Sequence, residues 1–318
     1  MDEGPLLDAL ITVGRRYGDS DADPVPLRQP GHRPGSGAVL VRCGPVVVKA
    51  HAAGTHPATL RARLAVAAGS ALADVLLAPL DPQPVAVADR VLSVWPYGAT
   101  VAADPTHVPW AEAATLLARL HSAASHAGEE LAGLPASGTP GRLVANIRAL
   151  RRRAPVDHSG AVPDAATIVE AAWRTLPAWV RGGGPAPGPV AVVHGDWHVG
   201  QLVAPRGVGW RLADVDDLGT GPLVWDFARL AALRALGVVR EDEFRRFLDS
   251  YWAAGGPALR PGSGTTADPA SWAALDAVAQ AAVVSMAARR LASPARTFPD
   301  ALDHDLLRVC ARLAARPV

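Results

Sequence analysis

The chain has 318 residues, a formal net charge of +1 and a sequence pI near 8.0. No basic block stands apart from acidic residues, so a nucleic-acid partner is not indicated, and no run of about 18 apolar residues predicts a membrane span. The only cysteines, Cys43 and Cys310, lie far apart without metal-ligand spacing, which favours a reducing, cytoplasmic location over a disulfide framework.

The first hundred residues predict a small part rich in strands. Two apolar pieces flank a turn at 43–45 and indicate a hairpin. A helix over 57–73 follows, with Pro57 at a favourable first position. The segment 95–98, Trp-Pro-Tyr-Gly, then breaks the pattern and predicts a hinge. The predicted strands are 38–41, 46–48, 75–80 and 85–95.

Beyond residue 100 the pattern becomes helical, with one embedded strand at 190–193 and a hairpin-like pair around Gly207. Strand runs followed by helix runs predict an α+β protein with two lobes. We expect an N-terminal lobe over 1–95, a C-terminal helical lobe over 96–318, and a hinge at about 94–98. The predicted helices are 109–125, 164–180, 223–237, 241–253, 271–292 and 301–315.

Lys49 is the only lysine among the 31 Lys and Arg residues, and it follows the valine run 46–48. Arginine has evidently replaced lysine elsewhere. A strand-end lysine is often only a solvated charge. The alternative is that this position requires a compact, flexible ammonium rather than the planar guanidinium fork.

Asp196 and Asp214 each follow a strand-like run, and Gln201 lies on the same loop as Asp196. An amide oxygen and a carboxylate are hard ligands of the kind that Mg²⁺ takes together with substrate phosphates. The other carboxylate can orient and deprotonate a hydroxyl. The set therefore indicates magnesium-dependent phosphate chemistry.

His194 and His198 are four residues apart, a spacing that on a helix would indicate zinc ligands. Gly195 and Gly200 favour a loop instead, and the glutamate of the zinc protease motif is missing. A metal hydrolase remains the alternative from another class of enzyme.

Three segments resemble the aminoglycoside phosphotransferase superfamily of small-molecule kinases, which have a protein-kinase-like fold. They are HGDWHVGQ at 194–201, DVDDLG at 214–219 and WDFARL at 225–230. The form HGDxHxGQ is similar to actinobacterial maltokinases and aminosugar kinases of that superfamily. A short match, LARLHS at 117–122, is weak by itself.

The resemblance implies a bilobal fold, ATP or GTP and Mg²⁺ as cofactors, and a role for each matching residue. Asp196 would be the catalytic base, and Lys49 would bind the α- and β-phosphates. Asp214 would hold Mg²⁺ with Gln201, which stands where the family usually has Asn. Trp95 and Tyr97 would lie at the adenine, and His194, Asp216 and Asp226 would be supports. Trp197 and Asp217 are possible substrate contacts. Ser36 belongs to the glycine-rich loop 31–40, which could cover the phosphates or be an ordinary hairpin turn. Trp197 could equally pack the loop, Asp216 could be a second metal contact, and Asp217 could belong to a surface turn.

The family pairs its lysine with a glutamate on the following helix, but no acid occurs between Asp23 and Asp74. The helix offers Arg61 and Arg63 instead. Either Lys49 lacks its usual partner, or Asp74 or Asp214 serves.

The sequence predicts a nucleotide-dependent phosphotransferase that acts on a hydroxyl of a small molecule. The expected acceptors are an aminoglycoside or other antibiotic, which would confer antibiotic resistance, or an amino sugar or sugar. A catalytically weak or inactive nucleotide-binding or ligand-binding member of the same fold is the alternative.

Overall fold

The computed structural model describes residues 3–18, 22–27, 37–102, 107–123, 128–153, 164–259, 268–293 and 300–315. The chain divides into two compact units. Unit 1 comprises Met1–Ala136 and Val199–Gly219, and unit 2 comprises Ser137–His198 and Thr220–Val318. These two units do not coincide with the predicted lobes 1–95 and 96–318. The boundary between those lobes stays a prediction.

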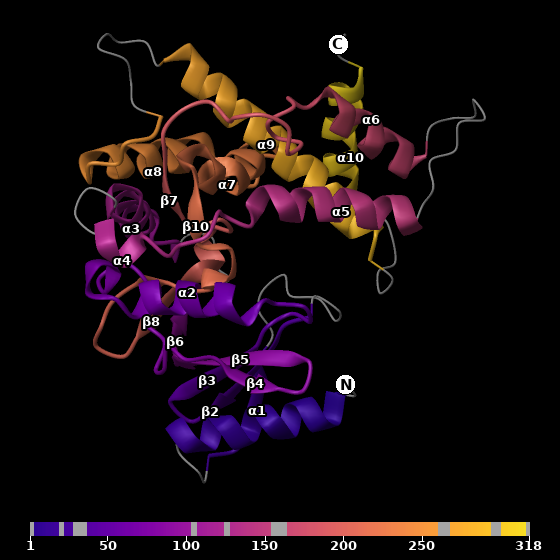
Figure 1. Ribbon diagram of the computed structural model, residues 1–318. Helices are drawn as coiled ribbons and strands as arrows, with labels where there is room; N and C mark the ends of the chain where they lie inside the picture. Colours follow the sequence, from indigo (N-terminus) through magenta and orange to yellow (C-terminus); the bar gives the residue numbers. More distant parts are fainter. Residues whose placement is uncertain are drawn as a thin grey trace. The chain divides into compact units, whose positions relative to one another are not determined.

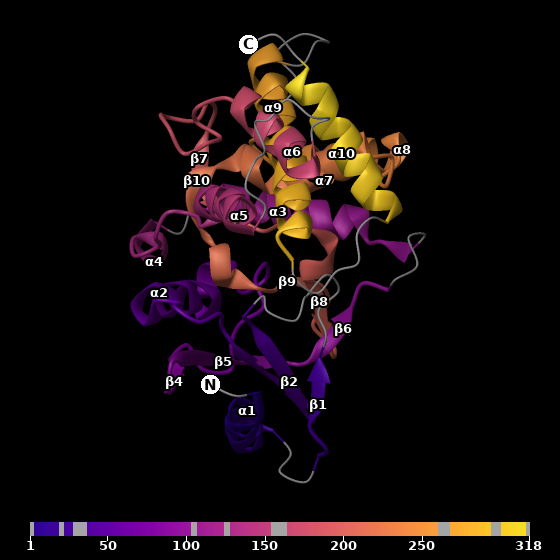
Figure 2. The ribbon, with the colours of Figure 1, turned by 90° about the vertical axis from the view of Figure 1, so that its right-hand side faces the viewer.

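Unit 1 contains a five-stranded antiparallel sheet in the order β1-β2-β3-β5-β4. Helix α1 (Glu3–Tyr17) lies along one face of this sheet (Figures 1 and 2). The predicted hairpin is confirmed as β2 and β3, which turn at Gly44 with a φ of +58°. The strands are β1 (Val25–Leu27), β2 (Val39–Cys43), β3 (Val46–Ala50), β4 (Val85–Val87) and β5 (Arg90–Pro96).

The alternation of side chains along β3 places Lys49 on the face away from α1. Val46, Val48 and Ala50 belong to the core that α1 covers. Val47 and Lys49 therefore point to the opposite face, because successive side chains in a strand alternate. Both line a cavity there.

Unit 1 also contains a second, three-stranded antiparallel sheet in the order β6-β8-β9. Gly98 on β6 approaches β8 so closely that an added Cβ would lie 2.6 Å from the carbonyl carbon of Ala204. The prediction of a strand over 75–80 is wrong, since Leu76 forms only a single bridge with Leu212. The elements are α2 (Pro57–Ala68), β6 (Gly98–Thr100), α3 (Trp110–Ser122), α4 (Gly128–Leu131), β8 (Leu202–Pro205) and β9 (Arg211–Leu212).

Unit 2 is built mainly from helices packed around α9 (Pro269–Leu291). α9 contacts α5, α6, α7 and α10 (Figures 1 and 2). It is long and apolar enough to cross a membrane by length and composition alone, and its packing against four helices accounts for that composition. The other elements are α5 (Thr139–Arg153), α6 (Ala165–Thr175), β7 (Val190–Val193), β10 (Gly219–Pro222), α7 (Ala228–Ala235), α8 (Glu241–Ala253) and α10 (Ala301–Ala314).

The helices predicted beyond residue 100 are present, with their ends shifted by a few residues. Helix α8 shows the expected periodicity, because Phe244, Phe247 and Tyr251 are all buried. The predicted helix over 223–237 begins with a 3₁₀ turn at Leu223–Phe227 before α7. The α+β class is therefore confirmed.

Candidate active site

Lys49 is buried, at 5% exposure, and two carboxylates hold its ammonium in unit 1. Its Nζ lies 2.6 Å from Asp214 Oδ1 and 2.9 Å from Asp216 Oδ2. Burial alone would lower the pKa of Lys49, but the two aspartates outweigh it and raise the pKa. Asp74 instead pairs with Arg211 at 3.1 Å. Of the two acids that the sequence offers as partners of Lys49, Asp214 forms the ion pair, and Asp216 forms a second one.

Asp214 adopts a left-handed backbone conformation, with φ +63° and ψ +68°. It comes just after β9, at the start of the 3₁₀ turn Val215–Asp217. Such a conformation is uncommon outside glycine, although aspartate tolerates it better than most residues. Lys49 binds one carboxylate oxygen, and the Gln201 amide donates to the other at 3.4 Å. The strained backbone therefore presents the carboxylate toward both groups.

The donor set formed by Asp214 and Gln201 fits Mg²⁺. A half-turn of the Gln201 amide would exchange its nitrogen for its oxygen and give a second hard ligand beside the carboxylate. Among the residues that the structure describes, no group of three or more His, Cys, Asp or Glu side chains is arranged to hold a metal ion. A site with few protein ligands suits Mg²⁺, which usually completes its coordination with water and substrate phosphates.

A buried network that the sequence did not predict holds Asp216 from the other side. His51 Nδ1 lies 2.9 Å from Asp216 Oδ1, and His51 Nε2 is 2.7 Å from Ser93 Oγ. Trp95 Nε1 donates to the same hydroxyl at 2.7 Å. Burial by itself raises the pKa of Asp216, but Lys49 and His51 outweigh it and bring the pKa far below its usual range. The sequence does contain one sign of this network: Lys49 and His51 are two residues apart, and that spacing places both side chains on the same face of a strand.

Arg63 on α2 fixes the turn that carries Asp216. Its Nε donates to the carbonyl of Leu218 at 2.8 Å, and its Nη1 donates to the carbonyl of Asp216. Helix α2, on which a glutamate partner of Lys49 is expected, thus carries the cation Arg63 instead. Arg63 holds the backbone of the turn, and the turn supplies the second acid to Lys49.

A cavity of about 270 Å³ opens beside these groups in unit 1. Trp95 and Tyr97 contribute to its apolar part, and Lys49, Gln201 and Asp214 form its polar end.

The predicted adenine segment is partly occupied by contacts within unit 1. The amide of Tyr97 donates to Pro45 O at 2.7 Å, and Val94 O accepts from Leu80 N at 2.9 Å. A base bound here would therefore use other backbone groups of the segment 94–98. Ser36 lies outside the described residues.

In unit 2, Asp226 fixes the loop that carries Asp196. The Asp226 carboxylate, which is buried, accepts hydrogen bonds from the amides of His194 at 2.7 Å and Gly195 at 2.8 Å. Gly195 has a φ of +81°, a conformation that glycine adopts without strain. His194 is fully buried beneath the loop. Asp226 and His194 thus lie where supports of the loop are expected.

The Asp196 side chain is 36% exposed and lies against two arginines that the sequence did not predict. Its Oδ1 is 3.2 Å from Arg142 Nη2 and 3.9 Å from Arg229 Nη1. Burial raises the pKa of Asp196, but Arg142, His198, Arg229 and His194 together lower it below the usual value. Asp196 is therefore a carboxylate at neutral pH, the form that can accept a proton.

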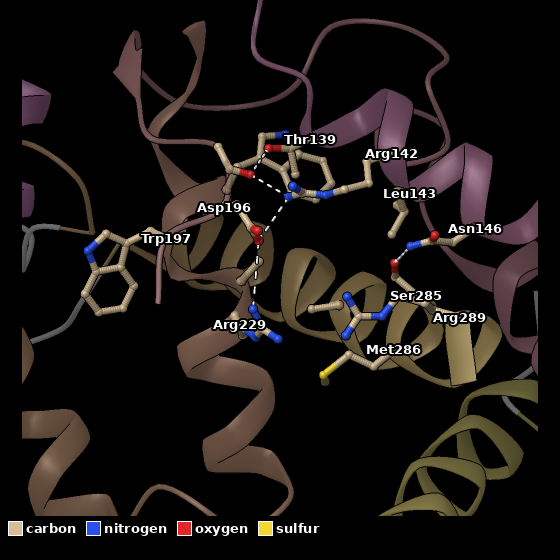
Figure 3. A pocket seen from close by; sticks show the side chains of 14 residues that line it. Thr139, Arg142, Leu143, Asn146, Asp196, Trp197, Arg229, Ser285, Met286 and Arg289 are labelled. Carbon is tan, nitrogen blue, oxygen red and sulfur yellow. Dashed lines mark hydrogen bonds and ion pairs between the residues drawn. The ribbon is translucent and has the colours of Figure 1, made fainter. Parts of the chain in front are cut away.

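Asp196 faces a cavity of about 140 Å³ in unit 2 (Figure 3). Trp197 is only 3% exposed and packs on Phe247 at 4.9 Å between ring centroids, and it also contributes to the lining of this cavity. Its packing role and its contact with a substrate both stay predictions. Asp217 belongs to the 3₁₀ turn of unit 1 and is not among the described residues that line either cavity.

A family model described as the phosphotransferase enzyme family matches residues 39–275, well over half of the chain. Comparison with curated proteins gives no match.

Solved structures of kinase-like phosphotransferases share the fold. A choline/ethanolamine kinase family protein from Mesorhizobium loti aligns with a TM-score of 0.60 and 17% identity, over 100% of this chain and 96% of that one. An amicoumacin kinase in complex with AMP-PNP and Ca²⁺ aligns with a TM-score of 0.63 and 12% identity, over 90% and 88% of the two chains. A GDP complex of an aminoglycoside 2′-phosphotransferase aligns with a TM-score of 0.60 and 12% identity, over 99% of both chains. The expected protein-kinase-like fold is therefore confirmed.

Proposed function

Because the chain belongs to the phosphotransferase enzyme family, we propose that it transfers the γ-phosphoryl group of ATP or GTP to a hydroxyl of a small molecule. The observation that carries this proposal is Asp196, a carboxylate held on a fixed loop and facing a cavity. Asp196 would orient the acceptor hydroxyl and take its proton as the oxygen attacks phosphorus.

The unit 1 cavity is the proposed nucleotide site. Its apolar part suits a flat base, and Lys49 at its polar end supplies fixed positive charge for phosphate oxygens. Asp214 and Gln201 would hold Mg²⁺, which neutralises the charge that develops on the phosphates. Fold relatives in complex with AMP-PNP or GDP make either purine nucleotide a candidate donor.

The non-catalytic alternative was motivated by the absence of a helix glutamate for Lys49. Asp214 and Asp216 provide the positioning that the glutamate would give. We therefore favour an active enzyme. The two cysteines are unpaired and buried, and a reducing cytoplasm suits them.

The test is Asp196→Asn, which keeps the size of the side chain and removes the base. Turnover should fall at least about 100-fold, the low end for a general base, while the thermal shift given by Mg-ATP or Mg-GTP is retained. The wild-type acceptor is sought by mass spectrometry over aminoglycosides, other antibiotics, amino sugars and maltose. Unchanged turnover in the variant would refute the role of Asp196. Nucleotide binding by the wild type without any phosphorylated product would favour the non-catalytic alternative.

A further inference from the structure

The peptide bond that precedes Asp196 is bound on both sides. The carbonyl of Gly195 accepts hydrogen bonds from Thr139 Oγ1 and from Arg142 Nη2, the latter at 2.8 Å (Figure 3). The amide of Asp196 belongs to the same planar peptide unit and donates to His194 Nδ1 at 3.4 Å. The backbone therefore enters Asp196 in a fixed orientation.

The same nitrogen of Arg142 also binds the side chain of Asp196. Arg142 Nη2 lies 2.8 Å from the Gly195 carbonyl oxygen and 3.2 Å from Asp196 Oδ1. A terminal nitrogen of a guanidinium group carries two hydrogens, so it can donate one to each acceptor. Arg142 thus bridges the backbone and the carboxylate, and the bridge restricts rotation of the Asp196 side chain.

The helix that carries this bridge is itself held in unit 2. Thr139 and Arg142 are three residues apart in the first turn of α5 and therefore lie on one face of it. Farther along α5, the Asn146 amide donates to Ser285 Oγ of α9 at 2.8 Å. A side chain on a packed helix holds a neighbouring group more precisely than a side chain on a loop.

Charged and titratable groups face Asp196 from several helices and from its own loop. Among the described residues they are Arg142 of α5, Arg229 of α7, His194 and His198 of the loop, and Arg289 of α9, which lines the same cavity. Burial is the largest influence on the pKa of Asp196 and raises it, and Arg142 is the largest of the influences that lower it. Removing Arg142 should therefore raise the pKa of Asp196.

The two oxygens of the Asp196 carboxylate differ in their contacts. Arg142 lies 3.2 Å from Oδ1, and Arg229 lies 3.9 Å from the same oxygen. Within the residues that the structure describes, these contacts leave Oδ2 as the oxygen that can take a proton.

We propose that Arg142 is a positioning residue for phosphotransfer, which bridges the Gly195 carbonyl and one oxygen of Asp196 so that the other oxygen faces the acceptor hydroxyl. This inference rests on the proposed function and adds a residue to its machinery. Asp196 remains the group that takes the proton, and Arg142 acts through it. Displacing a reacting group by about 1 Å can lower the rate about 100-fold, so such a bridge can matter for turnover.

The first measurement requires no acceptor. The full chain is labelled with isotope-enriched aspartate, and NMR follows the carboxyl signal of Asp196, which is identified by its loss in Asp196→Asn. The pKa of Asp196 should rise in Arg142→Met. It should keep its wild-type value in Thr139→Val, which removes only a hydroxyl, and in Arg148→Met. Arg148→Met is the matched control, because Arg148 is an exposed residue of α5 outside the cavity lining.

The second measurement is turnover of Mg-ATP or Mg-GTP, with water as the acceptor and with any small molecule that the wild type phosphorylates. Arg142→Met should lower kcat on the order of 10- to 100-fold and leave the KM of the nucleotide unchanged. Its activity should also be lost at a higher pH on the acidic side, because a base with a raised pKa is protonated sooner. Thr139→Val should lower kcat by a smaller factor without moving the pH profile, and Arg148→Met should change neither.

Melting temperatures of all variants accompany both measurements. A loss of kcat in Arg142→Met that comes with a lower melting temperature and an unchanged pKa of Asp196 would overturn the inference, since that pattern marks a merely structural contact. A higher KM of the nucleotide with an unchanged kcat would also overturn it.

The two proposals fail in different ways. Turnover by the wild type with an equal kcat in Arg142→Met and Arg148→Met would overturn the role of Arg142 and leave phosphotransfer standing. No turnover by the wild type with any acceptor would instead refute the proposed function, whatever the titration of Asp196 shows.

Discussion

Replacing Asp216 with Asn tests whether this aspartate takes the place of the missing helix glutamate. The change keeps the shape of the side chain and removes the charge that faces Lys49 at 2.9 Å and His51 at 2.9 Å. A charge-assisted hydrogen bond contributes about 1.5–3 kcal/mol. About a third of the Asp216 side chain is exposed, so solvent weakens the interaction, and Lys49 keeps Asp214 as a partner. We expect the free energy of unfolding in urea to fall by about 1.5 kcal/mol.

Asp249→Asn is the control for loss of a carboxylate, since Asp249 is an exposed residue of α8. It should change stability by less than about 0.5 kcal/mol. Asp216→Asn should also lower turnover more than Asp249→Asn, because Lys49 loses one of its two positioning contacts. Equal stability and equal turnover in the two variants would refute the substitution of Asp216 for the glutamate.

The same pair of proteins, wild type and Asp216→Asn, gives a pH test with a definite sign. The folded-state pKa of Asp216 is lowered, so its contribution is fully present above the unfolded-state pKa of about 3.9. It is lost as the pH falls below that value toward the folded-state pKa. The difference in the free energy of unfolding between the two proteins should narrow as the pH falls below about 4. A gap that widens in acid would contradict the assignment.

Three further variants test the loop, the sheet and the metal site. Asp226→Ala removes a buried acceptor of two backbone hydrogen bonds and should lower the free energy of unfolding in urea by about 3 kcal/mol or more. Asp249→Ala, at an exposed site of α8, should lower it by less than about 0.5 kcal/mol, and similar values for the two variants would contradict the anchoring role of Asp226. Gly98→Ala forces a methyl group against the backbone of β8 and should lower the free energy of unfolding by about 1–3 kcal/mol. Gly141→Ala in α5, where the added methyl group meets open space, should leave it unchanged or raise it. An unchanged free energy of unfolding in Gly98→Ala would show that β6 and β8 can move apart freely. Asp214→Asn keeps a residue that tolerates the left-handed backbone conformation and removes the negative charge. Mg²⁺ should then no longer increase the thermal shift that ATP gives, and a retained effect of Mg²⁺ would place the metal elsewhere.

The residues around Lys49 in unit 1 could be predicted from local sequence to a large extent. Lys49 stands at the end of an apolar strand, and Asp214 and Gln201 belong to short loops after strands, so each had a local pattern. The strand prediction at 75–80 failed because burial there comes from packing and a single bridge to Leu212, which an apolar run does not distinguish from a strand.

The partners of these residues had no such pattern. Arg63 donates a hydrogen bond to the carbonyl of Leu218, which is 155 residues away in the sequence. The Asn146 amide donates to Ser285, which is 139 residues away. The spacing of arginines on α5 or α9 reads as a solvated helix face when each helix is considered alone. Only the packing of the two helices turns the arginines toward one cavity.

The sequence by itself determined the α+β class, the loop with Asp196 and the isolated Lys49, because these depend on residue types at short range. The tertiary structure alone decided which acids hold Lys49 and what charge surrounds Asp196. The physical reason is that electrostatic interactions depend on distance in space and on burial, and a chain folds residues from remote positions to within a few ångströms. A lysine that lacks a glutamate in the sequence can therefore be fully paired in the protein.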